Sequence, residues 1–230
     1  MINRRNILCA ASLMPLAGCV SLPRQDYQPL RLFAESPDGP MPLHYGPLPL
    51  EQFPVPAVPP GVVEKKYWRR RTISPFTQFA PGTIIVDPQS YYLYLIEPGE
   101  TAMRYGIGVG RQGFAWSGNA TIALKRQWPR WKAPASMIAR RPDLEPYSVA
   151  NGGMAPGLNN PLGARALYLF HNGVDTLYRI HGTPEARSIG RAVSSGCIRM
   201  LNHDVIDLYG RVPIGASVIV RQAQLPPQLA

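Results

Sequence analysis

Short apolar runs separated by turn residues dominate the central part of the chain, a pattern typical of β-strands. Residues 83–86 and 91–96 form two such runs, and the turn dipeptide Asp87-Pro88 lies between them. We expect these runs to pair as a hairpin, followed by a third strand near residues 103–109 and a fourth at 121–124.

A second hairpin is predicted further along the chain, around an Asn-Gly dipeptide. The runs 167–170 and 176–181 flank Asn172-Gly173, and Asn-Gly readily adopts the positive φ angles that a tight hairpin turn needs. His181 therefore ends a predicted strand, where a sheet can fix the direction of its side chain.

Helical signals are short and few. Residues 134–140 begin with proline, which suits the first turn of a helix, and a second helix over residues 203–209 follows Asn202, a good N-capping residue. A last strand is expected at 216–220. The Pro- and Gly-rich segment 128–161 is too long for a simple connection, and such loops are often functional. We therefore expect a mainly β fold with short peripheral helices.

The first nineteen residues have the features of a bacterial export signal. Arg4 and Arg5 precede an apolar stretch over residues 7–18, which is too short to span a bilayer as a permanent helix. The stretch ends in the letters LAGC at residues 16–19, which resemble a lipoprotein cleavage site, so Cys19 is the predicted lipidation site. Cleavage without lipidation is the alternative, and both the general secretory and the twin-arginine routes stay open.

Proline dominates the segment that follows, residues 20–66. Because proline lacks a backbone donor and fixes φ, we expect an extended tether here, although its few apolar residues could pack along a domain surface. The compact domain is predicted over residues 67–222, followed by a tail at 223–230. About 210 residues remain after the export signal, enough for one domain with a sizeable core.

The net charge of +10 and the pI near 9.9 favour acidic partners. For an exported protein these are anionic lipid headgroups or the carboxylates of the cell wall, and nucleic acid is not expected. The densest basic run, residues 65–71, is expected to form a solvated face.

Cys197 is the one cysteine beyond the predicted export signal, and His181 precedes it by sixteen residues. In an oxidising compartment a retained cysteine needs a reason, and a thiol beside an imidazole base can carry out acyl transfer. The backbone amides of Ser195, Gly196 and Cys197 could stabilise the oxyanion of that reaction. From spacing alone, the alternative is a buried cysteine and a histidine that belongs to the core.

The full strings around these two residues resemble a known signature. The letters HGT at residues 181–183 and SSGCIRM at 194–200 resemble the L,D-transpeptidase catalytic domain, also called the YkuD-type domain. The resemblance extends back through NPLG at 160–163 and YGIGVG at 105–110. It implies a sandwich-like arrangement of mixed β-sheets with short peripheral helices.

The resemblance also implies roles for individual residues. Cys197 would be the nucleophile, His181 the general base, and the backbone carbonyl of Gly182 the group that orients the imidazole. Arg199 matches a position implicated in substrate binding, and a surface salt bridge is its alternative role. The common family string has histidine where Ser195 stands, which leaves a side-chain role at that position in doubt.

The implied reaction is acyl transfer on peptidoglycan stem peptides through a cysteine thioester. Terminal D-alanine is released, and the acyl group then forms a crosslink or attaches a protein to the wall. Water as the acceptor would instead make an L,D-carboxypeptidase, and a non-catalytic, lipid-anchored wall-binding module is the third possibility. No cofactor is expected and no metal site is predicted. We expect a periplasmic protein anchored by lipid to a membrane, the outer membrane of a Gram-negative bacterium.

Overall fold

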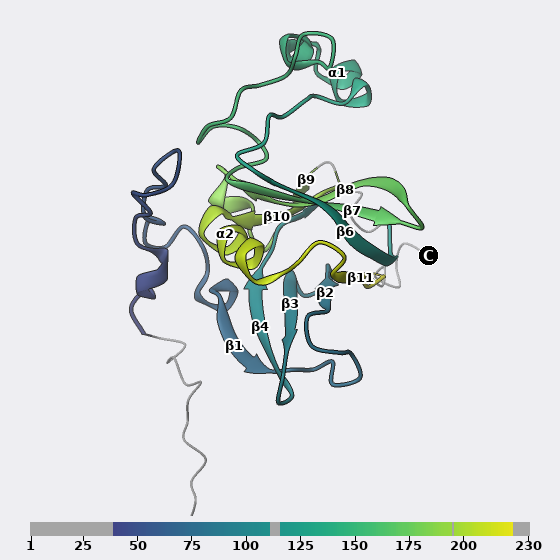
Figure 1. Ribbon diagram of the computed structural model, residues 1–230. Helices are drawn as coiled ribbons and strands as arrows, with labels where there is room; N and C mark the ends of the chain where they lie inside the picture. The colour runs from purple at the N-terminus through teal and green to yellow at the C-terminus, as the bar shows by residue number, and fades with distance from the viewer. Residues whose placement is uncertain (1–38, 111–115, 195, 223–230) are drawn as a thin grey trace, which may run out of the picture. The chain divides into compact units, whose positions relative to one another are not determined.

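The computed structural model describes residues 39–110, 116–194 and 196–222 (Figure 1). In chain order the strands are β1 (Arg70–Ile73), β2 (Ile84–Asp87), β3 (Tyr92–Glu97), β4 (Thr101–Gly106), β5 (Val109–Gly110), β6 (Gly118–Gln127), β7 (Arg165–His171), β8 (Val174–Thr183), β9 (Ala192–Ser194), β10 (Ile198–Leu201) and β11 (Ser217–Val220). The helices are α1 (Ala135–Arg140) and α2 (Asn202–Arg211), and 3-10 turns lie at Leu43–Tyr45, Lys65–Tyr67, Pro142–Tyr147 and Ala186–Ser188. The described chain is therefore mainly β, as the sequence pattern predicts.

Within the described ranges, nine strands form one mixed sheet in the order β1-β4-β3-β2-β11-β6-β7-β8-β10, and β5 pairs with β9 separately. Strand β11 joins the two halves, because it runs parallel to β2 and antiparallel to β6. Buried residues from both halves meet in one core, including Ile84 and Leu93 from the first half and Ile122, Leu167 and Ile180 from the second. Two sheet halves that share one core give the sandwich-like arrangement.

Both predicted hairpins are present. Strands β2 and β3 pair antiparallel, as do β7 and β8 (Figure 1). Asn172 and Gly173 adopt φ angles of 49° and 78°, the positive values that the Asn-Gly turn was expected to supply.

The predicted third strand over residues 103–109 is wrong as a single element. It is divided into β4 and β5, which belong to different sheets. The break follows from close backbone approaches at Gly106 and Gly108, where a side chain would collide with Tyr67 and with the Ser188 carbonyl, respectively. Gly108 instead exchanges two backbone hydrogen bonds with Arg199, at 2.8 and 2.9 Å.

The predicted capping role of Asn202 is also wrong. Helix α2 begins at Asn202 itself, with Leu201 at the N-cap position. The Asn202 side-chain oxygen accepts a hydrogen bond from the Ala164 backbone N–H at 2.9 Å, which ties the start of α2 to the chain before β7. His203 is buried, and its Nε2 lies 2.8 Å from the Gly46 carbonyl oxygen.

Residues 39–66, which fall in the range expected to be an extended tether, pack against the strands and α2. Proline blocks sheet pairing but does not prevent neighbouring side chains from being buried, and Tyr45, Val55, Val58 and Val63 are all below 10% exposed. The Tyr45 hydroxyl donates to Asp204 Oδ2 of α2 at 3.2 Å. This segment is therefore part of the folded domain.

The basic run 65–71 is only partly the expected solvated face, because Lys65, Lys66 and Arg71 are exposed while the residues between them are largely buried. Trp68 and Arg69 are 9% exposed, and the Arg69 backbone N–H donates to the Tyr45 hydroxyl at 2.6 Å. The run continues into the edge strand β1, which sequence analysis missed.

Candidate active site

The parallel pairing of β8 and β10 lines up the candidate residues. Arg199 lies directly across from His181, and Ile198 across from Ile180. Side chains alternate along a strand, so Cys197, Arg199 and His181 share one face of this pair. The opposite face carries Ile180 and Ile198, which are buried in the core.

Cys197 immediately precedes β10, two positions before the residue that pairs with His181. A strand separation of about 4.8 Å and a rise of about 3.3 Å per residue give a Cα separation from His181 of roughly 8 Å. At such diagonal spacing, side chains on one face can meet. The register therefore places the two residues at a spacing that their side chains could bridge.

The backbone before the thiol requires glycine. Gly196 has a φ of 134°, a conformation that residues with a side chain rarely adopt. This turn brings the Cys197 Sγ to 3.9 Å from the Leu177 carbonyl oxygen in β8. Ser195, predicted as an oxyanion donor, lies outside the described residues, whereas Gly196 and Cys197 are described.

His181 is buried and its ring is oriented by the main chain. Its Nδ1 lies 2.6 Å from the Gly182 carbonyl oxygen, which can only accept, so the proton is on Nδ1 and the lone pair is on Nε2. Burial lowers the pKa of His181 to about 4, and the nearby charges of Arg199 and Arg179 act in the same direction. At neutral pH the imidazole is therefore neutral and able to accept a proton.

The Cys197 thiol is in a different electrostatic position. Burial raises its pKa above the ordinary value of 9.0, while a hydrogen bond from the Arg179 backbone and the charges of Arg179 and Arg199 act against that rise. The thiol is therefore protonated at neutral pH, and it needs a base to become a nucleophile.

Two arginines lie near Cys197 and His181, the pair of candidate residues that we call the dyad. Arg199 donates to Glu185 Oε2 at 2.5 Å, so the salt bridge that was the alternative role for Arg199 is present in the structure. Arg179 donates twice to Asp175, at 2.7 Å each, and its guanidinium lies 4.4 Å from the Tyr168 ring centroid.

Neither Arg179 nor Glu185 is among the site residues predicted from the sequence. Arg179 lies two residues before His181 in a predicted strand, so the two-residue alternation of strands would have placed it on the same face. Glu185 carries no comparable signal, because its contact with Arg199 depends on how the loop after β8 folds.

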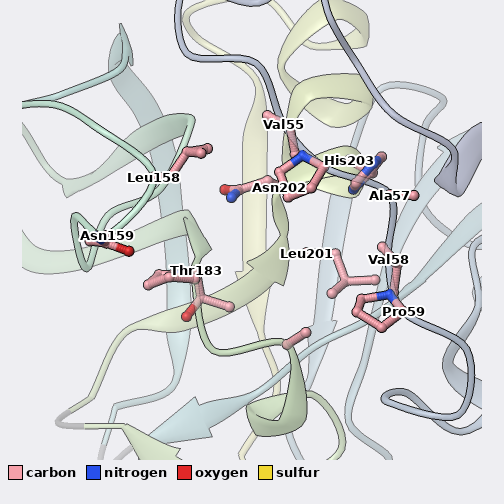
Figure 2. Close-up of a pocket in the computed structure, with 13 residues that line it drawn as sticks. Val55, Ala57, Val58, Pro59, Leu158, Asn159, Thr183, Leu201, Asn202 and His203 are labelled. Carbon is pink, nitrogen blue, oxygen red and sulfur yellow. The ribbon is translucent and has the colours of Figure 1, made fainter.

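A pocket of about 300 Å³ lies further along the same face of β8 and β10 (Figure 2). Thr183 and Leu201, which pair in register two positions beyond His181 and Arg199, belong to its lining. The remaining walls come from residues 55–59, Leu158 and Asn159, Pro184 and Ala186, and the start of α2. The lining residues are apolar or uncharged at neutral pH, since burial lowers the pKa of His203.

The described parts of the chain contain no cluster of His, Cys, Asp and Glu suited to holding a metal ion. Among the helices within those same parts, none has the length and apolar character to cross a membrane.

The family model of the YkuD L,D-transpeptidase catalytic domain matches residues 81–220, which is more than half of the chain. The chain therefore belongs to this family. The matched range contains Cys197, His181, Gly182 and Arg199.

Individual relatives agree with this assignment. "Putative L,D-transpeptidase YqjB" from Bacillus subtilis (strain 168) is 44% identical over 139 residues, covering 60% of this chain and 69% of that protein. "Probable L,D-transpeptidase YbiS" from Escherichia coli (strain K12) is 34% identical over 139 residues, covering 59% of this chain and 43% of that protein. This chain therefore spans less than half the length of YbiS.

Among solved structures, a Brucella melitensis protein described as a "Probable carnitine operon oxidoreductase caia" is 48% identical. The match covers 68% of this chain and 94% of that chain, with a TM-score of 0.47.

Proposed function

We propose that this protein is a cysteine-dependent L,D-transpeptidase that acts on peptidoglycan stem peptides. The observation that carries the proposal is the register of β8 with β10, which puts His181, Arg199 and the preceding Cys197 on one face. Family membership supports the substrate class, and the geometry supports the roles proposed for the residues.

In the first half-reaction, His181 Nε2 takes the thiol proton as the Cys197 sulfur attacks the carbonyl of the third, diamino-acid residue. Backbone N–H groups at residues 195–197 stabilise the oxyanion of the tetrahedral intermediate. The intermediate collapses by breaking the peptide bond. His181 returns the proton to the leaving amine, so D-alanine departs and a thioester to Cys197 remains.

In the second half-reaction, an acceptor amine loses a proton to His181 and attacks the thioester. The new amide bond forms as the C–S bond breaks, and the sulfur recovers its proton from His181. The Nδ1–H contact with the Gly182 carbonyl keeps Nε2 directed at the reacting atoms through both steps. The acceptor is a second stem peptide or a protein destined for wall attachment.

The proposal includes a location. Export followed by lipidation at Cys19 would hold the protein at the outer membrane, facing the periplasm, with residues 20–38 between the anchor and the packed segment. The net charge of +10 suits an acidic wall polymer as substrate.

Incubation of the purified full-length protein with defined tetrapeptide muropeptides, followed by mass spectrometry of the products, tests the activity. We expect loss of D-alanine together with crosslinked products, and neither with Cys197→Ser, because an alkoxide is far harder to generate than a thiolate. Tripeptides without any amide-linked product would identify a carboxypeptidase. Unchanged muropeptides with the wild-type protein would overturn the enzymatic assignment.

A further inference from the structure

Arg199 is held by a carboxylate from its own chain. Glu185 Oε2 accepts from Arg199 Nη1 at 2.5 Å, and the side chain of Arg199 is 19% exposed whereas that of Glu185 is 67% exposed. The arginine is thus largely enclosed beside the dyad, while its counter-ion reaches it from the solvent side.

The backbone of Glu185 is fixed although its carboxylate is at the surface. Its N–H donates to Thr183 Oγ1 at 3.0 Å. Its carbonyl accepts from the N–H and the hydroxyl of Ser188, at 2.9 and 2.6 Å. The side chain can therefore leave Arg199 by rotation about its own bonds, without any change in the loop.

We propose that Glu185 is an internal competitor for substrate: it occupies on Arg199 the position that a carboxylate of the acyl donor takes when the donor binds. The inference rests on the proposed function for the identity of the donor. When the donor carboxylate replaces that of Glu185, the Arg199 guanidinium keeps a negatively charged partner and a hydrogen bond. Donors that carry the carboxylate can displace Glu185, whereas amidated donors cannot.

The strength of the Glu185–Arg199 ion pair sets how strongly Glu185 competes with the donor. Exposed ion pairs contribute little because solvent screens them, so removing Glu185 should strengthen anion binding at Arg199 by about two- to fivefold. This modest value lets Glu185 tune the preference for anionic donors without blocking them.

Alkylation of Cys197 tests the competition without any reference to transpeptidation. Iodoacetate and iodoacetamide modify the same thiol but differ in one carboxylate, and peptide mapping of the full-length protein reports modification at Cys197 by itself. The ratio of the two rate constants should rise about two- to fivefold in Glu185→Gln. In Glu64→Gln, which removes an equally exposed carboxylate from the Lys66 ion pair, the ratio should not change.

The same substitution in an Arg199→Gln background separates direct competition from a general charge effect. If Glu185 acts through Arg199, Glu185→Gln should leave the ratio unchanged in that background. An equal rise in both backgrounds, or no rise with Arg199 present, would overturn the proposal.

Donor kinetics then connect the contact to the enzyme. The test uses two tetrapeptide donors that are identical except that one carboxylate is free in the first and amidated in the second. In Glu185→Gln, the KM of the free-acid donor should fall about two- to fivefold relative to that of the amidated donor. An unchanged ratio overturns the role of Glu185 in donor selection. If the wild-type protein turns over neither donor, the proposed function fails, and the alkylation ratio still decides whether Glu185 competes for Arg199.

Discussion

The protonation state of the dyad in the resting protein gives the sharpest mechanistic prediction. With a pKa of about 4, His181 is protonated in roughly one molecule in a thousand at pH 7. Even at its ordinary pKa of 9.0, a cysteine is about 1% thiolate at pH 7, and burial of Cys197 reduces that fraction further. The resting dyad is therefore a neutral thiol beside a neutral imidazole, and not a thiolate–imidazolium pair.

The rates of alkylation and of acylation at Cys197 should therefore depend differently on pH. Iodoacetamide reacts with the thiolate, so its rate constant at Cys197 should rise about tenfold per pH unit between pH 6 and 8. In the proposed mechanism, acylation by a stem peptide uses His181 as base, and neither His181 nor Cys197 changes its protonation state between pH 5 and 8. The acylation rate should therefore be flat in that range and should fall only as pH approaches 4, where His181 gains a proton.

Substitution of the base separates the two reactions. His181→Ala should slow acylation by about 10²–10⁴-fold, while the tenfold-per-unit slope of alkylation stays. The exposed His171, at the turn between β7 and β8, offers a matched control, and His171→Ala should change neither profile. An alkylation rate that is already level between pH 6 and 8 would reveal a preformed ion pair and refute this reasoning.

Three further predictions concern the fold and the anchor. Burial raises the pKa of Asp204 from 3.8 to about 7, although Arg69, whose Nε lies 3.7 Å from Asp204 Oδ1, acts against that rise. The folded state therefore keeps a proton that the unfolded state loses as pH rises, so urea unfolding should show the stability of Asp204→Asn rising relative to the wild type between pH 4 and pH 8, and a difference that does not change with pH would contradict this. Gly196→Ala, at φ 134°, should cost about 1–3 kcal/mol, whereas Gly210→Ala in α2, where a Cβ meets open space, should stabilise by about 1 kcal/mol; equal effects would contradict the backbone argument. Cys19→Ala should move the protein from the membrane to the soluble fraction on cell fractionation, and retention at the membrane would contradict lipid anchoring.

Local sequence signals predicted the elements whose geometry is set by nearby residues. The Asn172-Gly173 hairpin is the clearest case, because the turn itself requires those φ angles. The edge strand β1 escaped notice because charged residues are favoured on an exposed edge and hide the alternation of a strand. Asn202 was misassigned because its side chain finds a better partner in Ala164, a contact made only after the chain folds.

In the candidate site, too, the sequence predicts local features but not the contacts that form only when the chain folds. The strings around His181 and Cys197 predicted the candidate residues, but how these two residues lie relative to one another depends on the parallel pairing of β8 with β10, which no local pattern encodes. The Glu185–Arg199 contact lies beyond sequence reasoning for the same reason. The packing of Tyr45 against α2 joins residues 159 positions apart, so the proline pattern alone could not predict it.

The most direct test of the central claim is mass spectrometry of the Cys197 peptide after brief incubation of the full-length protein with a tetrapeptide donor and acid quenching. We predict an added mass equal to that of the donor minus that of D-alanine, located on Cys197 and absent from Cys197→Ser. Release of D-alanine with the same adduct on another residue, or with an unmodified Cys197 at every quench time, would contradict the thioester mechanism.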